Sequence, residues 1–246
     1  MGPKTIEFEI AFKKYIGSQF SISVNSATAA LHLALNAVGV GNGDEVIIPT
    51  NTFIATAEAV VYSGAKPILC DVEGNYHNID INLIEQLITP RTKAIIPVHF
   101  GGNPCDMDEI KKIANHFNLK IIEDAAHALP SSYKNKNIGT LSDAVCFSFY
   151  ATKTLTTGEG GMVTTNNSKI AEKIKIQRLH GISGDAWKRY GQNSDWYYEV
   201  VDLGYKYNTT DIQASIGIRQ LEKLEWMRDD RKKIAEKYKN AFAGKL

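Results

Sequence analysis

Short, almost wholly apolar segments alternate with segments of helical period along most of this chain. Residues 45–48, 66–72, 93–99, 120–123, 144–149 and 161–165 are expected to form strands. Helices are expected at 26–38, 53–63, 81–88, 106–117 and 168–179. Strands that are apolar at nearly every position are typical of a parallel sheet covered by helices on both faces. The alternation therefore predicts an α/β fold with a mainly parallel sheet between two layers of helices.

The last part of the chain departs from this alternation. Residues 181–207 are rich in Gly, Trp, Tyr and charge, and such a long loop inside a domain is often functional. From Thr210 the helical period returns, with an apolar stripe formed by Ile212, Ile216, Leu221, Leu224, Met227 and Ile234. We therefore expect a large domain over 1–209, followed by a long helix over 210–246.

Charge and cysteine content exclude several classes of protein. The chain has 28 Lys and Arg against 27 Asp and Glu, and no basic block, which argues against nucleic acid or an anionic membrane as partner. No apolar stretch approaches the roughly 20 residues that span a bilayer. Cys70, Cys105 and Cys146 are odd in number and lack metal-ligand spacing, which indicates reduced thiols and a cytoplasmic protein.

Lys153 is the first candidate catalytic residue. It follows the apolar segment 144–149 and precedes Gly158-Glu159-Gly160-Gly161. Reactive groups of α/β enzymes collect at strand ends, and a glycine-rich segment lets a flat cofactor approach the backbone. The alternative interpretation is a hairpin turn that carries an exposed lysine.

Asp124 follows the apolar segment 120–123 and is the second candidate. A carboxylate at the end of a buried strand is costly without a cationic partner, and a pyridinium ring would supply one. A lysine that forms a Schiff base and a carboxylate that pairs with a pyridine nitrogen are the protein groups of pyridoxal phosphate enzymes. Alternatively, Asp124 caps a helix or pairs with an arginine. A metal site of Glu123, Asp124 and His127 is disfavoured because no second His-rich cluster completes it, so no metal is predicted.

Two further segments suit the same cofactor. Asn25-Ser26-Ala27-Thr28 precedes a helix, and free N–H groups at a helix start bind phosphate. A simple N-cap is the alternative. Phe53 opens the next helix and could stack on a flat ring, although an aromatic residue is often core.

Taken together, these segments resemble the DegT/DnrJ/StrS sugar aminotransferase family, which belongs to the fold type I pyridoxal phosphate enzymes. Six ordered segments carry the resemblance, namely 25–33, 49–57, 89–99, 123–128, 148–161 and 204–214. The resemblance covers nearly the whole chain and implies the three-layer α/β/α large domain of these enzymes.

The resemblance implies a set of residue roles around pyridoxal 5'-phosphate. Lys153 and Asp124 would be catalytic, the first as Schiff-base lysine and proton carrier, the second as partner of the pyridine nitrogen. The other cofactor-binding residues would be Phe53 against the ring, His127 near the phenolic oxygen, Ala27, Thr28 and Ser148 at the phosphate, and Asn208 at the phosphate in the neighbouring protomer. A homodimer with shared active sites follows from this last role.

The family also implies a reaction and its substrates. An amino acid donor, usually glutamate, would give its amino group to a nucleotide-linked keto sugar during amino-sugar and polysaccharide biosynthesis. The order Gly204-Tyr205-Lys206-Tyr207-Asn208 favours amination at C4 of a UDP- or dTDP-linked sugar. Within 181–207, a lid over the sugar is expected from Trp187, Arg189, Trp196 and Tyr197.

Both ends of the chain depart from the family pattern. Members begin before Gly2 and carry a small C-terminal domain after the long helix, so the chain is expected to be shortened at both ends, with its apolar stripe uncovered. A shortened remnant or interaction module that keeps the fold without turnover is therefore an alternative function. A sugar 3-dehydratase is disfavoured, because those members have histidine in place of Lys153.

Overall fold

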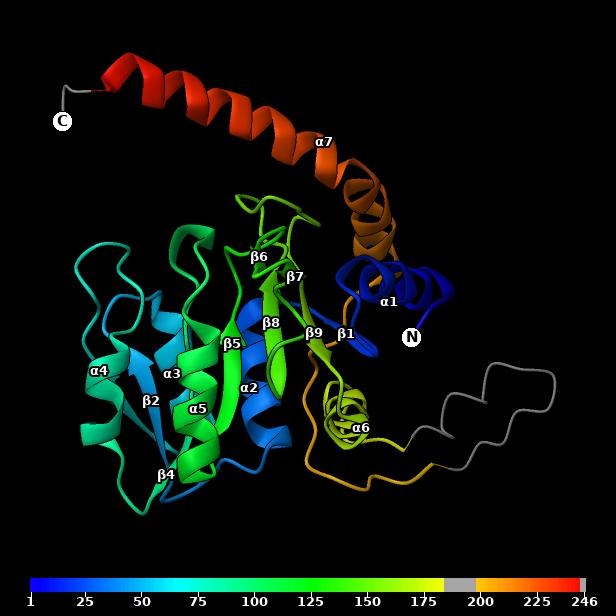
Figure 1. Cartoon of the computed structure of the whole chain (residues 1–246). Helices are drawn as coiled ribbons and strands as arrows, with labels where there is room; N and C mark the ends of the chain where they lie inside the picture. The colour runs from blue at the N-terminus through cyan, green and yellow to red at the C-terminus, as the bar shows by residue number, and fades with distance from the viewer. Residues whose placement is uncertain (184–197, 244–246) are drawn as a thin grey trace.

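A seven-stranded sheet forms the centre of this computed structural model, which describes residues 1–183 and 198–243 (Figure 1). The strand order is β1-β9-β8-β5-β4-β2-β3. The strands are β1 (Phe20–Val24), β2 (Glu45–Pro49), β3 (Lys66–Cys70), β4 (Thr92–Ile95), β5 (Lys120–Asp124), β8 (Ala144–Ser148) and β9 (Gly161–Thr165). From β8 to β3 all neighbours are parallel, whereas β9 runs antiparallel to both β8 and β1. The predicted α/β fold with a mainly parallel sheet is confirmed.

Helices cover both faces of this sheet (Figure 1). One layer consists of α2 (Ala27–Ala37), α3 (Ile54–Tyr62) and α6 (Ser168–Gln177). The other contains α1 (Pro3–Ile16), α4 (Ile81–Ile84), α5 (Met107–Phe117) and the first part of α7 (Asp211–Phe242). Two 3-10 turns, Glu85–Leu87 and Phe100–Gly102, and a small hairpin of β6 (Ser132–Tyr133) with β7 (Lys136–Asn137) complete the described elements.

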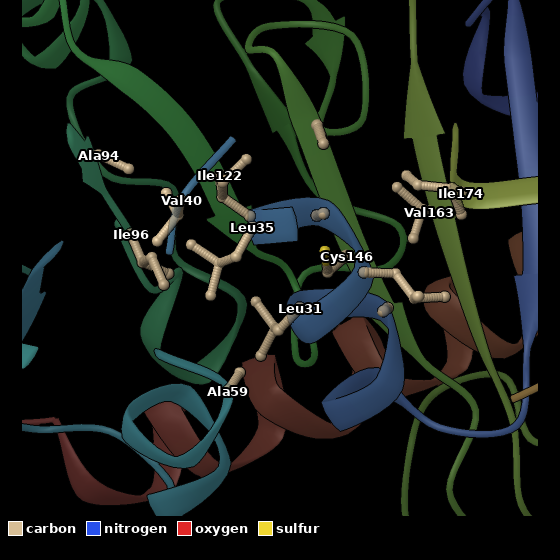
Figure 2. Close-up of a cluster of buried hydrophobic side chains, with 14 of the residues drawn as sticks. Leu31, Leu35, Val40, Ala59, Ala94, Ile96, Ile122, Cys146, Val163 and Ile174 are labelled. Carbon is tan, nitrogen blue, oxygen red and sulfur yellow. The ribbon is translucent and has the colours of Figure 1, made fainter. Parts of the chain in front are cut away.

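Strands β2, β4, β5, β8 and β9 are mostly apolar because each contributes to two cores. Side chains along a strand point alternately to opposite faces of the sheet. Ile122 belongs to the cluster with Leu31 and Leu35 of α2 (Figure 2), whereas Ile121 packs in the cluster that contains Ile110 of α5. A one-faced sheet would have left alternate positions polar, so the sequence pattern and the two-sided packing agree.

The sequence did not reveal α1 and β1, although both carry core residues. Phe8, Phe12 and Ile16 recur at four-residue intervals and are buried on one face of α1. The serines of β1 obscured the strand, because Ser21 and Ser23 are polar but buried. Both are satisfied by α1: the Ser21 hydroxyl donates to the carbonyl of Glu9, and the amide and hydroxyl of Ser23 each donate to Glu9 Oε1 over 2.9 Å.

The long helix α7 begins at the expected residue and is only partly covered. Thr210 and Gln213 form a capping box at its start. Leu224 is fully buried against the core that contains α1, whereas Ile212 and Ile234 are 77% and 53% exposed. The apolar stripe is therefore covered in its middle and exposed at both ends. Although α7 is long, no helix among the described residues is both long and apolar enough to cross a membrane.

Candidate active site

One cavity of about 470 Å³ opens where the carboxyl ends of β2, β4, β5 and β8 meet the start of α2. Carboxyl ends of parallel strands are where α/β proteins bind their ligands. Among the residues that line it are the predicted site residues Ala27, Thr28, Phe53, Asp124, His127, Ser148 and Lys153. The structure thus gathers at one place residues from across the first 153 positions of the sequence.

Asp124 is held rigidly at the end of β5. Its side chain is buried, and each carboxylate oxygen accepts one hydrogen bond: Oδ2 from the Thr56 hydroxyl at 2.8 Å and Oδ1 from the Ala126 amide at 3.1 Å. Its backbone amide donates to Pro97, and its carbonyl accepts from the amide of His99. Within the described part of the chain Asp124 has no arginine partner, so its charge remains available to a cationic ligand.

Lys153 is half-buried and lies near Asp124 and His127. Burial lowers the pKa of the Lys153 amine, and the negative charge of Asp124 partly opposes this effect. Burial also lowers the pKa of His127, and the charge of Lys153 lowers it further, whereas Asp124 raises it. A lysine whose pKa is lowered has its lone pair available closer to neutral pH, which a nucleophilic amine requires.

The loop that carries Lys153 is tied down at several points. The amide of Phe149 donates to the carbonyl of Gly160 over 2.8 Å, and the amide of Thr157 donates to the carbonyl of Phe149 over 2.9 Å. From α7, the side-chain amide of Gln213 donates to the carbonyl of Glu159 over 3.0 Å. Because β8 and β9 are antiparallel neighbours, this loop does join the two strands of a hairpin, as the alternative held. Lys153 is half-buried rather than exposed, however, and a separate helix braces the loop.

The glycines of this loop are needed for two reasons, a left-handed backbone at one position and close packing at two others. Gly158 has a φ of +81°, which favours glycine, and open space around it. A Cβ on Gly160 would lie 2.3 Å from Thr157 Oγ1, and one on Gly161 would lie 2.6 Å from the backbone carbonyl of Ser26. The glycine-rich segment was expected to let a cofactor approach the backbone. At Gly161, glycine instead lets the start of β9 lie close to the start of α2.

The start of α2 offers N–H groups to an anion. The Ser26 hydroxyl accepts the amide of Ala29 at 3.1 Å, and the Ser26 carbonyl accepts the amide of Ala30. Ser26 is therefore an N-cap, as the alternative interpretation held. The amides of Ala27 and Thr28 belong to the first helical turn, which has no intrahelical acceptors. Both residues line the cavity, so the cap and an anion site are compatible there.

Phe53 lies at the N-cap position of α3 and is 76% exposed, with its ring at the cavity. The interpretation of Phe53 as a core residue is therefore wrong. Asn208 is the predicted residue that does not line the cavity, and its side-chain amide donates to the carbonyl of Thr209 over 3.0 Å. The predicted lid residues Trp187, Arg189, Trp196 and Tyr197 lie outside the described residues.

A buried pair beside the cavity was not found from the sequence. His99 Nε2 and Glu123 Oε2 are 2.8 Å apart, and both side chains are fully buried. Because His99 Nδ1 accepts the amide of Cys105 at 3.1 Å, its Nε2 must carry the proton and donate to Glu123. Glu123 is therefore paired with His99. In residues 1–183 and 198–243, no group of three His, Cys, Asp or Glu side chains is arranged to hold a metal ion.

Comparison with known proteins places this site in a family. The family model described as the DegT/DnrJ/EryC1/StrS aminotransferase family matches residues 1–245. The chain is 60% identical over 242 residues to the uncharacterized protein MJ1066 of Methanocaldococcus jannaschii, and 50% identical over 241 residues to the spore coat polysaccharide biosynthesis protein SpsC of Bacillus subtilis. These alignments cover 98% of this chain but only 63% and 62% of the two relatives.

A solved structure agrees with these relatives. The fold is similar to that of Spr1654 of Streptococcus pneumoniae, a candidate sugar aminotransferase solved in its PMP form, with a TM-score of 0.92 and 37% identity. The match covers 99% of this chain and 66% of that protein. Because the family model matches nearly the full length of this chain, the chain belongs to the DegT/DnrJ/EryC1/StrS aminotransferase family.

Proposed function

We propose that this chain carries the cofactor site of a pyridoxal 5'-phosphate-dependent sugar aminotransferase. The observation that carries the proposal is the meeting of Lys153 and Asp124 in one cavity, with the start of α2 and the exposed ring of Phe53 on its walls. Because the chain spans less than two thirds of the length of its curated relatives, catalysis and substrates are proposed for the protein of which this site is part.

The residues present fit the cofactor. The cavity volume of about 470 Å³ lies within the usual range for small-molecule sites. Lys153 supplies the amine, Asp124 an anion for the pyridine nitrogen, and the amides of Ala27 and Thr28, with the Ser148 hydroxyl, suit the phosphate. Phe53 would cover one face of the ring, and His127 would lie near its phenolic oxygen.

When bound, the cofactor supplies an electron sink for breaking a C–H bond next to nitrogen. The chain's own residues then orient and move protons. Asp124, fixed through both oxygens, holds a proton on the ring nitrogen. Lys153, whose pKa is lowered by burial, accepts a proton at Nζ and returns it to a neighbouring carbon. The hydrogen bond from Gln213 to the lysine loop helps to hold the loop that carries this amine in place.

We further propose an amino acid donor, usually glutamate in this family, and a nucleotide-linked keto sugar as acceptor, with amination at C4. The similarity to SpsC, a spore coat polysaccharide biosynthesis protein, and to Spr1654, a candidate sugar aminotransferase, supports a sugar acceptor. We also propose a homodimer with shared sites. Asn208 does not line its own chain's cavity, which is compatible with its proposed role at the cofactor phosphate of a neighbouring protomer.

Incubation of the chain with pyridoxal phosphate, followed by borohydride reduction and peptide mapping, tests the cofactor site. The expected result is a new visible absorbance and a label on the peptide that contains Lys153. Lys153→Ala should abolish both, whereas Lys169→Ala, at an exposed position of α6, should change neither. A label spread over surface lysines, or none, would contradict the proposal.

Turnover is tested separately with glutamate and a set of 4-keto nucleotide sugars. An amino-sugar product would exclude the non-catalytic alternative for this chain. Cofactor binding without any product would leave the cofactor site standing and favour the non-catalytic alternative for these 246 residues alone.

A further inference from the structure

Two threonines form a chain of hydrogen bonds that ends on Asp124. Thr52 Oγ1 lies 2.7 Å from Thr56 Oγ1, which in turn lies 2.8 Å from Asp124 Oδ2. Thr56 is fully buried in the first turn of α3, while Thr52 lines the cavity. A chain of hydrogen bonds therefore runs from one cavity-lining side chain, Thr52, through the buried Thr56 to a second cavity-lining side chain, Asp124.

The direction of these hydrogen bonds follows from counting protons. A threonine hydroxyl has one proton to donate, and an ionised carboxylate can only accept. Both oxygens of Asp124 accept, one from the Ala126 amide and the other from Thr56. Thr56 thus donates its only hydroxyl proton to Asp124, so Thr52 must be the donor in the hydrogen bond between the two threonines.

This direction has two consequences for a ligand in the cavity. Hydrogen bonds in a chain polarise one another, so the Thr52 bond strengthens the one that Thr56 makes to the carboxylate. Thr52 also has no proton left for the cavity and presents only lone pairs there. Any direct hydrogen bond between a bound molecule and Thr52 Oγ1 must then be donated by that molecule.

We infer that Thr52 and Thr56 form a one-way hydroxyl relay that positions the Asp124 carboxylate for the ring nitrogen of the cofactor. The inference rests on the proposed function for the identity of the ring. Thr56 is a positioning residue, since it acts through Asp124. The competing explanation is that Thr56 is an ordinary core residue whose hydroxyl merely finds the nearest acceptor.

Three substitutions separate these explanations. Thr56→Val keeps the shape and removes the hydroxyl, Thr56→Ser keeps the hydroxyl and removes the methyl group, and Thr52→Val removes only the outer donor. In titrations with pyridoxal phosphate, Thr56→Val should weaken binding about tenfold, the scale expected for one lost hydrogen bond to a charged group. Thr56→Ser should stay within about twofold of the parent chain, and Thr52→Val should lose about threefold.

A second measurement needs no cofactor. In denaturant unfolding, Thr56→Val should raise the unfolding equilibrium constant about tenfold in the parent chain but much less in an Asp124→Ala background, because the partner charge is gone. Equal effects in both backgrounds would overturn the relay. So would Thr56→Ser weakening pyridoxal phosphate binding as much as Thr56→Val, since packing rather than the hydroxyl would then matter.

The two measurements also distinguish failures. In one case, the parent chain does not bind pyridoxal phosphate, although unfolding shows the coupling between Thr56 and Asp124. The proposed function and the cofactor role of the relay then both fail. What remains is a pair of hydroxyls that stabilises a buried charge. If the parent chain binds the cofactor and Thr56→Val binds equally well, the relay fails and the proposed function stands.

Discussion

Gly161, the first residue of β9, lies directly against the backbone of Ser26, the residue that caps α2. A Cβ at Gly161 would lie 2.6 Å from the Ser26 carbonyl and 2.9 Å from the Ala27 nitrogen. This contact joins the end of the lysine loop to the helix start proposed to bind the cofactor phosphate.

Gly161→Ala should therefore displace the start of α2 and disturb the anion site. We expect a loss of about 1–3 kcal/mol in the free energy of unfolding, as for other overpacked positions, together with weaker binding of pyridoxal phosphate. Denaturant unfolding and a binding titration measure the two effects. Gly41→Ala is the matched control, because a Cβ there meets open space. Similar results for both variants would contradict the contact.

Phe53 is expected to matter for cofactor binding and little for folding, since its ring is 76% exposed. Phe53→Ala should leave the thermal midpoint of the cofactor-free chain almost unchanged. It should weaken pyridoxal phosphate binding by roughly three- to tenfold, the scale of one ring-stacking contact. Tyr76→Ala, at a ring that is 65% exposed and does not line the cavity, is the control. A large drop in the thermal midpoint of Phe53→Ala would show that the ring supports the fold.

The charge of Lys153 is expected to control the titration of His127. Because that charge lowers the pKa of His127, Lys153→Met should raise it in the cofactor-free chain. NMR titration of the imidazole proton signals measures the change. Lys169→Met, which removes an exposed ammonium on α6, should leave the signal unmoved. A downward shift in Lys153→Met would mean that the two side chains do not interact as the geometry indicates.

Lys153 should also cost the cofactor-free chain stability at neutral pH. Its pKa in the folded chain lies below the ordinary 10.5, so the unfolded chain binds the proton more tightly. The stabilising effect of the neutral amine is present above pH 10.5 and is lost as the pH falls to the folded pKa. Lys153→Met should therefore raise the thermal midpoint at pH 7. If it lowers the midpoint, packing of the lysine stem outweighs the cost of its charge.

Arg178, at the end of α6, links that helix to α1 and β1 and should be important for stability. Its guanidinium donates to Glu9 Oε1 and, over 2.8 Å, to the carbonyl of Ser23, and both charged side chains are nearly buried. Arg178→Ala should cost about 3–5 kcal/mol in unfolding free energy, because Glu9 keeps a buried charge without its cation. Arg219→Ala removes an equivalent pair with Glu222 at the surface and should have no measurable effect.

Local signals located most helices and strands correctly, because capping and period are properties of short segments. Asp106 caps α5 by accepting the amide of Glu109, as its position predicts. A capping box would also need the Glu109 side chain to accept the Asp106 amide, but that side chain pairs with Lys112 instead. Side-chain alternatives of this kind are close in energy and depend on neighbours that a sequence pattern does not identify.

Features that depend on distant partners were missed. The serines of β1 look like loop residues until Glu9 is known to satisfy them. The pairing of His99 with Glu123 joins residues from two strand ends, and nothing in either segment indicates the other. Thr56 left a weak signal, a hydroxyl in the first turn of an otherwise small and apolar helix, but its acceptor Asp124 lies far along the chain.

The direction of β9 determines how firmly the loop that carries Lys153 is held. A parallel successor to β8 would have required a long crossover, leaving the segment after Phe149 attached to the sheet at one end only. By reversing, β9 returns the chain to the edge it has just left, so that Gly160 closes onto Phe149. The lysine thus stands on a loop that is closed at both ends by paired strands, and the backbone of that loop cannot move away without breaking the hydrogen bonds between Phe149, Thr157 and Gly160.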